Sequence, residues 1–247
     1  IRYKKSAKTK LNSMSDLKII LVTASFGKTS IKNFIYDITS KELKTHKTPR
    51  SVNTLLGIIR DINENLPSDC QIYIVEAGAR LRGDIDEIVK FINPQIVVIG
   101  QIGGAHLEYF GSLDEVRVAK LEALNSNRLD TCIAHSSTNL QGKAVIYDEL
   151  ISEVKSSLDR VEFDMSLNGQ KSHFSAKVLG EFNSYNLGAA LLAASAVGIK
   201  NLSLDNIKSV EHRLQRIDAG GKIIIDDSFN GNLQGMIASY RLEIGRA

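Results

Sequence analysis

Tryptophan is absent from this sequence of 247 residues, proline and cysteine are scarce (3 and 2 residues), and aromatic residues make up only 6%. Cys70 and Cys132 stand alone without metal-ligand spacing, which excludes a disulfide framework and a cysteine-ligated zinc site. We interpret both as inert thiols in a reducing cytosol. Because side chains that stack on bases are nearly absent, the basic start of the chain favours a solvated linker over a nucleic-acid-binding arm.

Long hydrophobic runs are missing as well. The longest apolar stretch, residues 187–199, is too short to span a bilayer and is interrupted by Gly188 and Gly198. No secretory signal is recognised at the start, and a net charge of +3 over this length does not call for nucleic acid or an anionic membrane. We therefore expect no nucleic-acid partner, no membrane insertion and a cytoplasmic location.

The most informative stretch is residues 19–30, where an apolar strand pattern runs into a turn and then into a helical pattern. Gly27 would let the backbone approach a polyphosphate, Lys28 supplies a positive charge, and the Thr29 hydroxyl can bind magnesium. Ala24 stands where the short form of this phosphate-binding loop has its first glycine. The alternative is a glycine turn with an incidental lysine.

Strand and helix patterns alternate along the chain. Apolar strands are expected near residues 70–76, 95–100 and 131–134, with helices between them and an alanine-rich helix from about residue 182. Asn168-Gly169 predicts a hairpin turn in a region of weaker strand signals. This alternation predicts a P-loop-containing, doubly wound, mostly parallel α/β sheet flanked by helices. Glu76 would lie at the carboxyl edge of that sheet, where ligands bind.

Five separated motifs carry a family resemblance. They occupy residues 23–30, 48–57, 76–85, 105–122 and 226–232, and include Ala105-His106-Leu107-Glu108, Ala119-Lys120-Leu121-Glu122 and Asp226-Asp227-Ser228-Phe229-Asn230. In this order they resemble the Mur ligases, the ATP-dependent amide-forming enzymes of peptidoglycan precursor synthesis. Glu76-Ala77-Gly78-Ala79 followed by Gly83-Asp84-Ile85 is closest to the MurF branch of that family. Arg50 and Ser51 depart from the family's Gly-Asn.

The resemblance implies a mechanism in which ATP phosphorylates a peptide carboxylate and an amine then attacks the acyl phosphate. Two magnesium ions are implied, one held by Thr29 and Glu76, the other by His106 and a carbamylated Lys120. Catalytic roles are implied for Lys28, Lys120, His106 and Arg213, and nucleotide contacts for Ser25, Phe26, Gly27, Lys28, Thr29, Ser30, Asn183 and Asp227. Within that set, Asn183 would contact adenine, Arg213 the γ-phosphate and Asp227 the ribose.

Some of these residues have equally good structural interpretations. Ser30, Glu108 and Asn186 are as readily explained by a helix cap or a loop hydrogen bond as by direct ligand contact. A lysine between apolar positions, such as Lys120, ordinarily extends its amine to solvent.

The resemblance also implies a domain organisation and partners. Residues 1–15 are expected to form a basic linker, 16–212 the central ATP-binding domain, and 213–247 the start of a Rossmann-like carboxyl-terminal domain. We expect the family's amino-terminal UDP-binding domain to be absent from this sequence. A core without it should ligate poorly or not at all, since closure of the domains completes the site. The implied substrates are UDP-MurNAc-tripeptide and D-alanyl-D-alanine, and a monomer is expected.

Three alternatives remain open at this stage. One is a sister amide ligase, either another Mur enzyme or a folylpolyglutamate synthetase-like ligase, which Glu76-Ala77-Gly78-Ala79 disfavours. A second is a nucleotide-binding scaffold that does not ligate, although the sequence has no Asn-Lys-x-Asp motif for reading guanine. A third is a degenerate ligase kept as a partner subunit, in which replacement of Lys120 would have no consequence.

Overall fold

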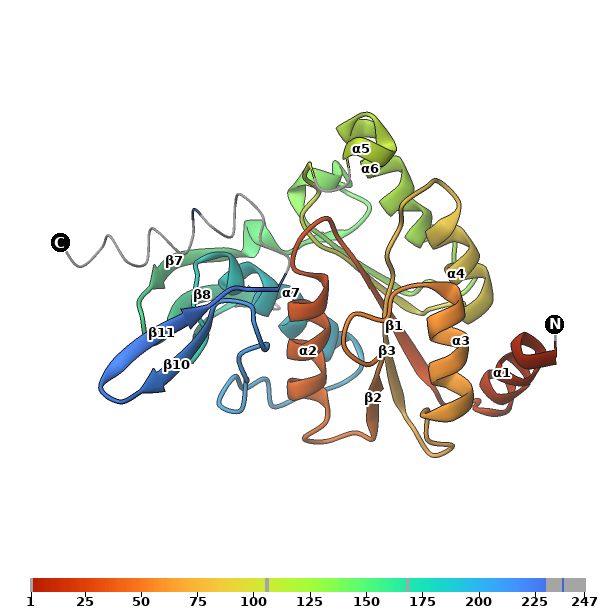
Figure 1. The fold of residues 1–247 in the computed structure, drawn as a ribbon, viewed down its shortest axis with the longest axis horizontal. Coiled ribbons are helices and arrows are strands. Elements are labelled where there is room, and N and C mark those ends of the chain that lie inside the picture. Colours follow the sequence, from red (N-terminus) through yellow and green to blue (C-terminus); the bar gives the residue numbers. More distant parts are fainter. Residues whose placement is uncertain (1, 105–106, 168, 230–236, 238–247) are drawn as a thin grey trace.

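The computed structural model describes residues 2–104, 107–167, 169–229 and 237 (Figure 1). The helices and strands follow in the order α1 (Arg2–Ser13), β1 (Lys18–Thr23), α2 (Lys28–Thr39), β2 (Thr45–Lys47), α3 (Leu55–Glu64), β3 (Ile72–Glu76), α4 (Asp84–Ile92), β4 (Ile96–Ile99), α5 (Leu107–Phe110), α6 (Leu113–Leu121), η1 (Glu122–Leu124), β5 (Thr131–Ala134), η2 (Ser136–Thr138), β6 (Val145–Ile146), η3 (Asp148–Leu150), β7 (Ile151–Ser156), β8 (Val161–Leu167), β9 (Gln170–Ala176), α7 (Phe182–Ala196), β10 (Gln215–Ala219) and β11 (Lys222–Asp226).

The main sheet confirms the predicted doubly wound architecture. Its strands lie in the order β2-β3-β1-β4-β5-β6, and every neighbouring pair is parallel. In β1, Val22 pairs with Glu76 of β3, and Thr23 pairs with Ile99 of β4. The connection after β1 runs toward β2, whereas the connection after the adjacent strand β4 runs toward β5 on the other side. The carboxyl ends of β1 and β4 therefore flank the switch point where such sheets bind ligands.

Helices cover both faces of this sheet because the side chains of β1 alternate between two apolar cores. Ile20 and Val22 pack with residues of α2 and α7 on one face. Ile19 and Leu21 pack with residues of α3 and α4 on the other. Figure 1 shows α2 and α3 on either side of the central strands, with the loops above the strand ends between them. The phosphate-binding loop is one of these, since it joins β1 to α2.

A second, antiparallel sheet of three strands, β7-β8-β9, packs beyond α7. Strands β8 and β9 form a hairpin where Asn168-Gly169 predicted a turn, although Asn168 itself lies outside the described residues. Helix α7 comes close to β7 through small residues. A Cβ atom at Gly188 would lie 2.5 Å from Cδ1 of Ile151, so a larger residue there would displace the end of that side chain.

The amino-terminal segment differs from the expected solvated linker. Residues Arg2–Ser13 form helix α1, in which Ala7 is fully buried against the core that contains α3 and α4. Lys8 and Lys10 donate from Nζ to the carbonyl oxygens of Phe91 (2.6 Å) and Ile62 (2.8 Å), near the carboxyl ends of α4 and α3. The sequence did not predict these contacts, because a lysine can bind a helix carbonyl while its charge stays near solvent.

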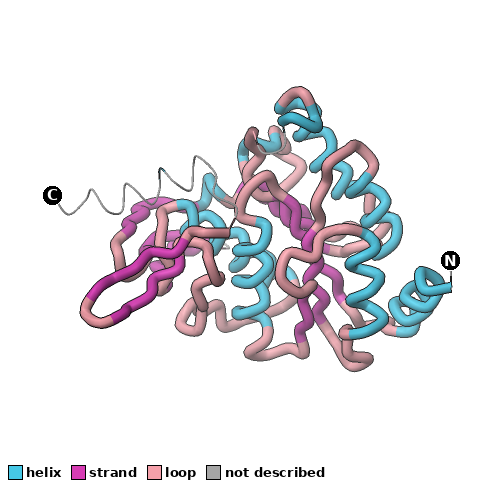
Figure 2. The backbone as a smooth tube through the Cα atoms, viewed as in Figure 1, coloured by secondary structure: helices cyan, strands magenta, loops and turns pink. Residues whose placement is uncertain are grey.

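Strands β10 and β11 form a separate two-stranded sheet. Figure 2 shows this hairpin projecting on the side of the molecule opposite to α1. Ile223 and Ile224 on β11 are exposed. Among the described residues, no helix has both the length and the apolar character needed to cross a membrane.

Candidate active site

The phosphate-binding loop has a backbone shape that requires glycine at its last position. Gly27 precedes α2 with φ at 79°, and a Cβ atom there would lie 2.5 Å from Oδ1 of Asn186 on α7. Ser25 anchors the loop to the segment after β4, because its N–H donates to the carbonyl of Gln101 (2.9 Å) and its hydroxyl to that of Gly103 (3.0 Å). Phe26 packs against Gly103. Asn186 therefore packs directly against this turn.

Lys28 lies within the loop rather than in open solvent. Its Nζ donates to the carbonyl oxygens of Ala24 (2.8 Å) and Ser25 (3.3 Å). Desolvation lowers the pKa of Lys28, an effect that the negative charge of Glu76 partly offsets. A positive group enclosed by a loop at a helix amino terminus is suited to an incoming phosphate.

Glu76, at the carboxyl end of β3, is the centre of the site. Only 1% of its surface is exposed. Its Oε2 accepts the Thr29 hydroxyl at 3.0 Å and lies 3.0 Å from Nζ of Lys32. Asn53 places its amide 3.5 Å from Oε1, and the N–H of Glu76 donates to the hydroxyl of Thr48 at 3.2 Å. The structure thus brings Thr29 and Glu76, the two residues expected to share one magnesium ion, into direct contact.

Lys32 is the site residue that the sequence analysis missed. It lies on α2, its side chain is 1% exposed, and its Nζ also donates to the carbonyl of Arg50. The available signal was its spacing, because residues three and four apart share one helix face and Lys32 follows Thr29 and Lys28 by those intervals. Arg50 adopts a left-handed backbone with φ at 46°, at the position where the family motif has glycine.

Lys120 on α6 is buried, with 2% of its surface exposed. The alternative in which its amine extends to solvent is therefore wrong. Burial and, to a smaller extent, the positive charge of Lys28 lower the pKa of Lys120 to about 7, against the opposing effect of Asp84, Glu122 and Glu76. Lys28, Glu76 and Lys120 thus lie close enough for their charges to interact. An amine with this pKa is largely neutral and nucleophilic near physiological pH.

Arg213 reaches the same site from the other end of the chain. Its Nη2 lies 3.3 Å from the Thr29 hydroxyl, to which it donates, and its guanidinium stacks 4.7 Å from the ring centroid of Phe229. Burial lowers the pKa of Arg213, whereas Glu76 and Asp227 raise it. Asp227 accepts the backbone N–H of Leu214 at 3.2 Å, and desolvation raises its pKa. These contacts bring the segment around residue 213 against the phosphate-binding loop.

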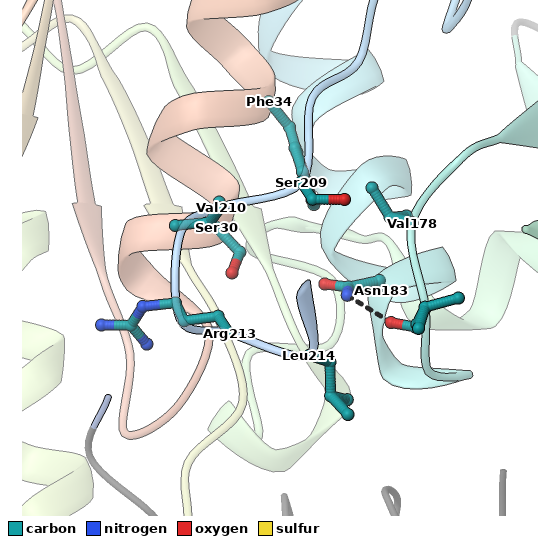
Figure 3. Close-up of a pocket in the computed structure, with 9 residues that line it drawn as sticks. Ser30, Phe34, Val178, Asn183, Ser209, Val210, Arg213 and Leu214 are labelled. Atoms are coloured by element: carbon teal, nitrogen blue, oxygen red, sulfur yellow. Dashed lines mark hydrogen bonds between the residues drawn. The ribbon is translucent and has the colours of Figure 1, made fainter. Parts of the chain in front are cut away.

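A recess lies between α2, α7 and the segment that carries Arg213 (Figure 3). It is too narrow to hold a water molecule, and its lining includes Ser30, Phe34, Val178, Leu179, Asn183, Ser209, Val210, Arg213 and Leu214. The amide of Asn183 donates to the Leu179 carbonyl at 2.7 Å and accepts from Asn186 at 3.0 Å. Both amides hold the start of α7 in place, and one N–H of Asn183 is left over for another partner.

The segment after β4 is anchored by a second polar group that the sequence analysis did not single out. The N–H of Ile102 donates to the Ser137 hydroxyl at 2.9 Å, and the N–H of Ser137 donates to Nδ1 of His135 at 3.0 Å. Asp148 accepts from the backbone and the hydroxyl of Ser136. These bonds hold the carboxyl ends of β4 and β5 together.

The metal-binding prediction can be assessed only in part, because His106 lies outside the described residues. Within the described part of the chain, no three His, Cys, Asp or Glu side chains form a group able to hold a metal ion. Thr29 and Glu76 offer oxygen atoms beside the phosphate-binding loop, which fits magnesium, an ion that takes only one or two protein ligands and shares phosphates and water. The donor chemistry is therefore suitable for that ion.

Comparison with known proteins agrees with this geometry. Residues 22–194 match the model of the Mur ligase middle domain. The chain is 27% identical over 243 residues to the UDP-N-acetylmuramoyl-tripeptide--D-alanyl-D-alanine ligase of Bacillus subtilis, a match that covers 91% of this chain and 52% of that protein. The chain thus spans about half the length of the curated relatives it matches.

Solved structures show the same fold. A crystal structure of MurF from Acinetobacter baumannii matches with a TM-score of 0.87 and 25% identity, over 98% of this chain and 57% of that one. The structure of MurF ligase from Thermotoga maritima in complex with ADP also has a TM-score of 0.87, at 21% identity, covering 98% of this chain and 60% of that one. The second likeness concerns the fold alone.

Replacing Arg50 by glycine should stabilise the protein. Left-handed backbone costs a residue with a Cβ about 1–2 kcal/mol, and glycine loses about 0.5–1 kcal/mol through the entropy of the unfolded chain. Because the Arg50 side chain is exposed, little packing is lost. Urea unfolding should show a gain of up to about 1 kcal/mol. Arg60→Gly, inside α3, is the control and should lose about 1 kcal/mol; losses in both variants would contradict the strain at Arg50.

Lys120→Met should remove a pH dependence of stability. Without carbon dioxide, burial lowers the pKa of folded Lys120 to about 7, whereas an unfolded lysine titrates near ~10.4. Between these values the unfolded chain binds more protons, so Lys120 makes the free energy of unfolding rise with pH, by up to roughly 1.4 kcal/mol per unit. Urea unfolding across about pH 7 to 9 should show a shallower rise in Lys120→Met. If the free energy of unfolding rises equally with pH in both proteins, Lys120 is not a buried neutral amine.

Proposed function

The chain belongs to the Mur ligase middle-domain family, and from this premise we propose that it is the ATP-binding core of a ligase that joins D-alanyl-D-alanine to UDP-MurNAc-tripeptide. The observation that carries the proposal is the grouping of Lys28, Thr29, Glu76, Lys120 and Arg213 at the carboxyl edge of the sheet, beside a glycine-dependent loop. This set supplies positive charges and oxygen ligands where a triphosphate would lie.

In the proposed reaction, the terminal carboxylate of the tripeptide attacks the γ-phosphorus of ATP. A bond forms between carboxylate oxygen and phosphorus, the bond to the β-γ bridging oxygen breaks, and ADP leaves. The amine of D-alanyl-D-alanine then attacks the acyl carbon, loses a proton, and expels phosphate to leave an amide. Phosphoryl transfer needs mostly positioning and neutralisation of charge. Lys28 and Arg213 supply that positive charge.

Magnesium would be held by Thr29 and Glu76 in one site and by His106 and carbamylated Lys120 in a second, and it would neutralise phosphate charge when bound. The chain's own contribution to the first site is to orient its oxygen atoms. The Thr29 hydroxyl already lies 3.0 Å from the Glu76 carboxylate, and Arg213 donates a hydrogen bond to the same hydroxyl. The two oxygens that would bind the metal are therefore already adjacent.

Carbamylation of Lys120 is supported by its lowered pKa. The neutral amine attacks the carbon of CO₂, a nitrogen–carbon bond forms, one C=O bond opens to an oxyanion, and the amine releases a proton to solvent. With a pKa of about 7, roughly nine-tenths of the amine is neutral at about pH 8, whereas an ordinary lysine is neutral in well under ~1% of molecules. The product carries oxygen ligands instead of a positive charge.

The nucleoside would lie at the mouth of the recess between α2 and α7, whose interior the side chains fill. Asn183 lines this recess and retains an N–H donor that suits a ring nitrogen of adenine. Asp227, next to the segment that closes the recess, would meet the ribose hydroxyls. We further propose that residues 16–212 form the central domain and residues 213–247 begin a second domain, with residues 1–15 acting as a linker in spite of their helical structure.

Nucleotide binding tests the proposal directly. The chain should bind a non-hydrolysable ATP analogue with magnesium in calorimetry, and Lys28→Met should weaken binding at least about tenfold, because a charge that faces phosphate is lost. Lys41→Met, which removes an exposed lysine bonded to the Ser203 carbonyl, is the matched control. Equal affinity for guanine nucleotides, or no effect of Lys28→Met, would contradict the assignment. Because the core by itself should ligate poorly, the reaction is identified with the chain joined to the remaining domains of a MurF ligase, where phosphate release should require both UDP-MurNAc-tripeptide and D-alanyl-D-alanine.

Carbon-13 NMR tests the modification of Lys120 separately. With ¹³C-bicarbonate at about pH 8, the protein should show one carbamate signal, since the neutral amine predominates there. Lys120→Met should lack the signal, whereas Lys32→Met should retain it. A spectrum without a carbamate signal in the unmodified chain would exclude carbamylation as a property of the chain without substrates.

A further inference from the structure

Lys32 forms a buried ion pair that the proposed reaction does not use. Its Nζ lies 3.0 Å from Oε2 of Glu76, and the two side chains are 1% and 2% exposed. Such a pair is costly to form, because both charges leave water, and its presence beside a ligand site calls for an explanation. The oxygen that Lys32 contacts is the same Oε2 that accepts the Thr29 hydroxyl.

The position of Lys32 conflicts with a divalent cation bound to Glu76 alone. An ammonium group at hydrogen-bond distance from Oε2 takes up space and repels a second cation at the same oxygen, and the repulsion is strong in a poorly hydrated interior. The charges of Lys28 and Arg213 also act on Glu76, so three positive groups surround one carboxylate. The described part of this site therefore carries excess positive charge, which disfavours a bare metal ion and favours a polyphosphate.

Lys32 also has a second acceptor that can hold it when Glu76 turns to another partner. Its Nζ donates to the carbonyl of Arg50, which the left-handed backbone at that residue directs toward α2. An ammonium group with two acceptors can weaken its bond to Glu76 and still remain paired. Asn53, from the same loop as Arg50, donates from its amide to Oε1, the other carboxylate oxygen of Glu76.

We propose that Lys32 is a positioning residue that keeps the Glu76 carboxylate oriented and closed to divalent cations until a nucleotide brings its own negative charge. This inference rests on the proposed function, because it presumes that Glu76 binds the metal of a metal–nucleotide complex. In the absence of nucleotide, Lys32 neutralises Glu76. When the phosphates arrive, their charge offsets that of Lys28, Lys32 and Arg213, and Glu76 becomes available.

Binding of Mn²⁺ without nucleotide tests the proposal. Free Mn²⁺ is measured by EPR in the unmodified chain, in Lys32→Met and in Lys10→Met, a control that removes a lysine bonded to a helix carbonyl away from the site. Lys32→Met should bind Mn²⁺ at least about tenfold more tightly than the unmodified chain, because the competing ammonium is gone. Lys10→Met should match the unmodified chain. A residue that only supports the fold would give loss of binding, never a gain.

Two further variants keep the test informative. Lys32→Gln can still donate a hydrogen bond to Glu76 and should show the same gain if Lys32→Met fails to fold. In Lys32→Met, Mn²⁺ should also raise the melting temperature, since it replaces the lost partner of Glu76, and Lys32→Met combined with Glu76→Gln should lose both effects. Unchanged Mn²⁺ affinity in the Lys32 variants would overturn the inference.

Measurements with an ATP analogue separate this result from failure of the proposed function. If the unmodified chain binds Mn²⁺ only with the analogue and the Lys32 variants behave identically, the inference fails while the proposed function stands. If no protein binds Mn²⁺ even with the analogue, both are overturned. A gain in the Lys32 variants together with nucleotide-dependent binding in the unmodified chain supports both.

Discussion

The buried carboxylate of Glu76 is the constraint on which the rest of the site depends. A charge removed from water is tolerated only when other groups replace its hydration. Here Thr29 and Lys32 of α2 and Asn53 of the loop after β2 surround it. A single charge therefore ties together the phosphate-binding helix, the end of β3 and a loop from the edge of the sheet. Loss of any one partner would leave the buried charge of Glu76 less well compensated.

The positive groups around Glu76 explain why this part of the molecule is suited to an anion. Lys28 is enclosed by its own loop, Lys32 is buried on α2, and Arg213 comes from a segment distant in sequence. Burial lowers the pKa of each of these groups, because removing its positive charge from water is unfavourable. Several groups perturbed in this way at one place are typical of a functional site rather than of a stable core.

The loops at the site are held by packing as much as by hydrogen bonds. Glycine is needed at position 27 because the backbone there is left-handed and because Asn186 occupies the space that a side chain would fill. Asn186 in turn bonds Asn183, so the turn of the phosphate-binding loop and the start of α7 support each other. The fold thus connects the proposed positions of phosphate and base through two amide side chains.

Much of the fold could be predicted from local patterns. The apolar strands of the parallel sheet, the loop that contains Gly27 and Lys28, and the helix rich in small residues all appear where the sequence indicated. Helix α1 was missed because its polar composition hides one small apolar contact through Ala7, which only its neighbours α3 and α4 make visible. Amino-acid composition indicates how polar a segment is on average, whereas the packing of a helix onto its neighbours depends on the residues of one helix face.

The sequence by itself determined the order of elements, the phosphate-binding loop and the motifs shared with the family, because these depend on residues close together in the chain. Only the tertiary structure decided that Lys120 is buried, that Lys32 faces Glu76, and that Arg213 reaches Thr29. Whether a lysine side chain extends into water or pairs with a buried acid depends on segments far away in sequence. These segments come together only when the helices pack onto the sheet.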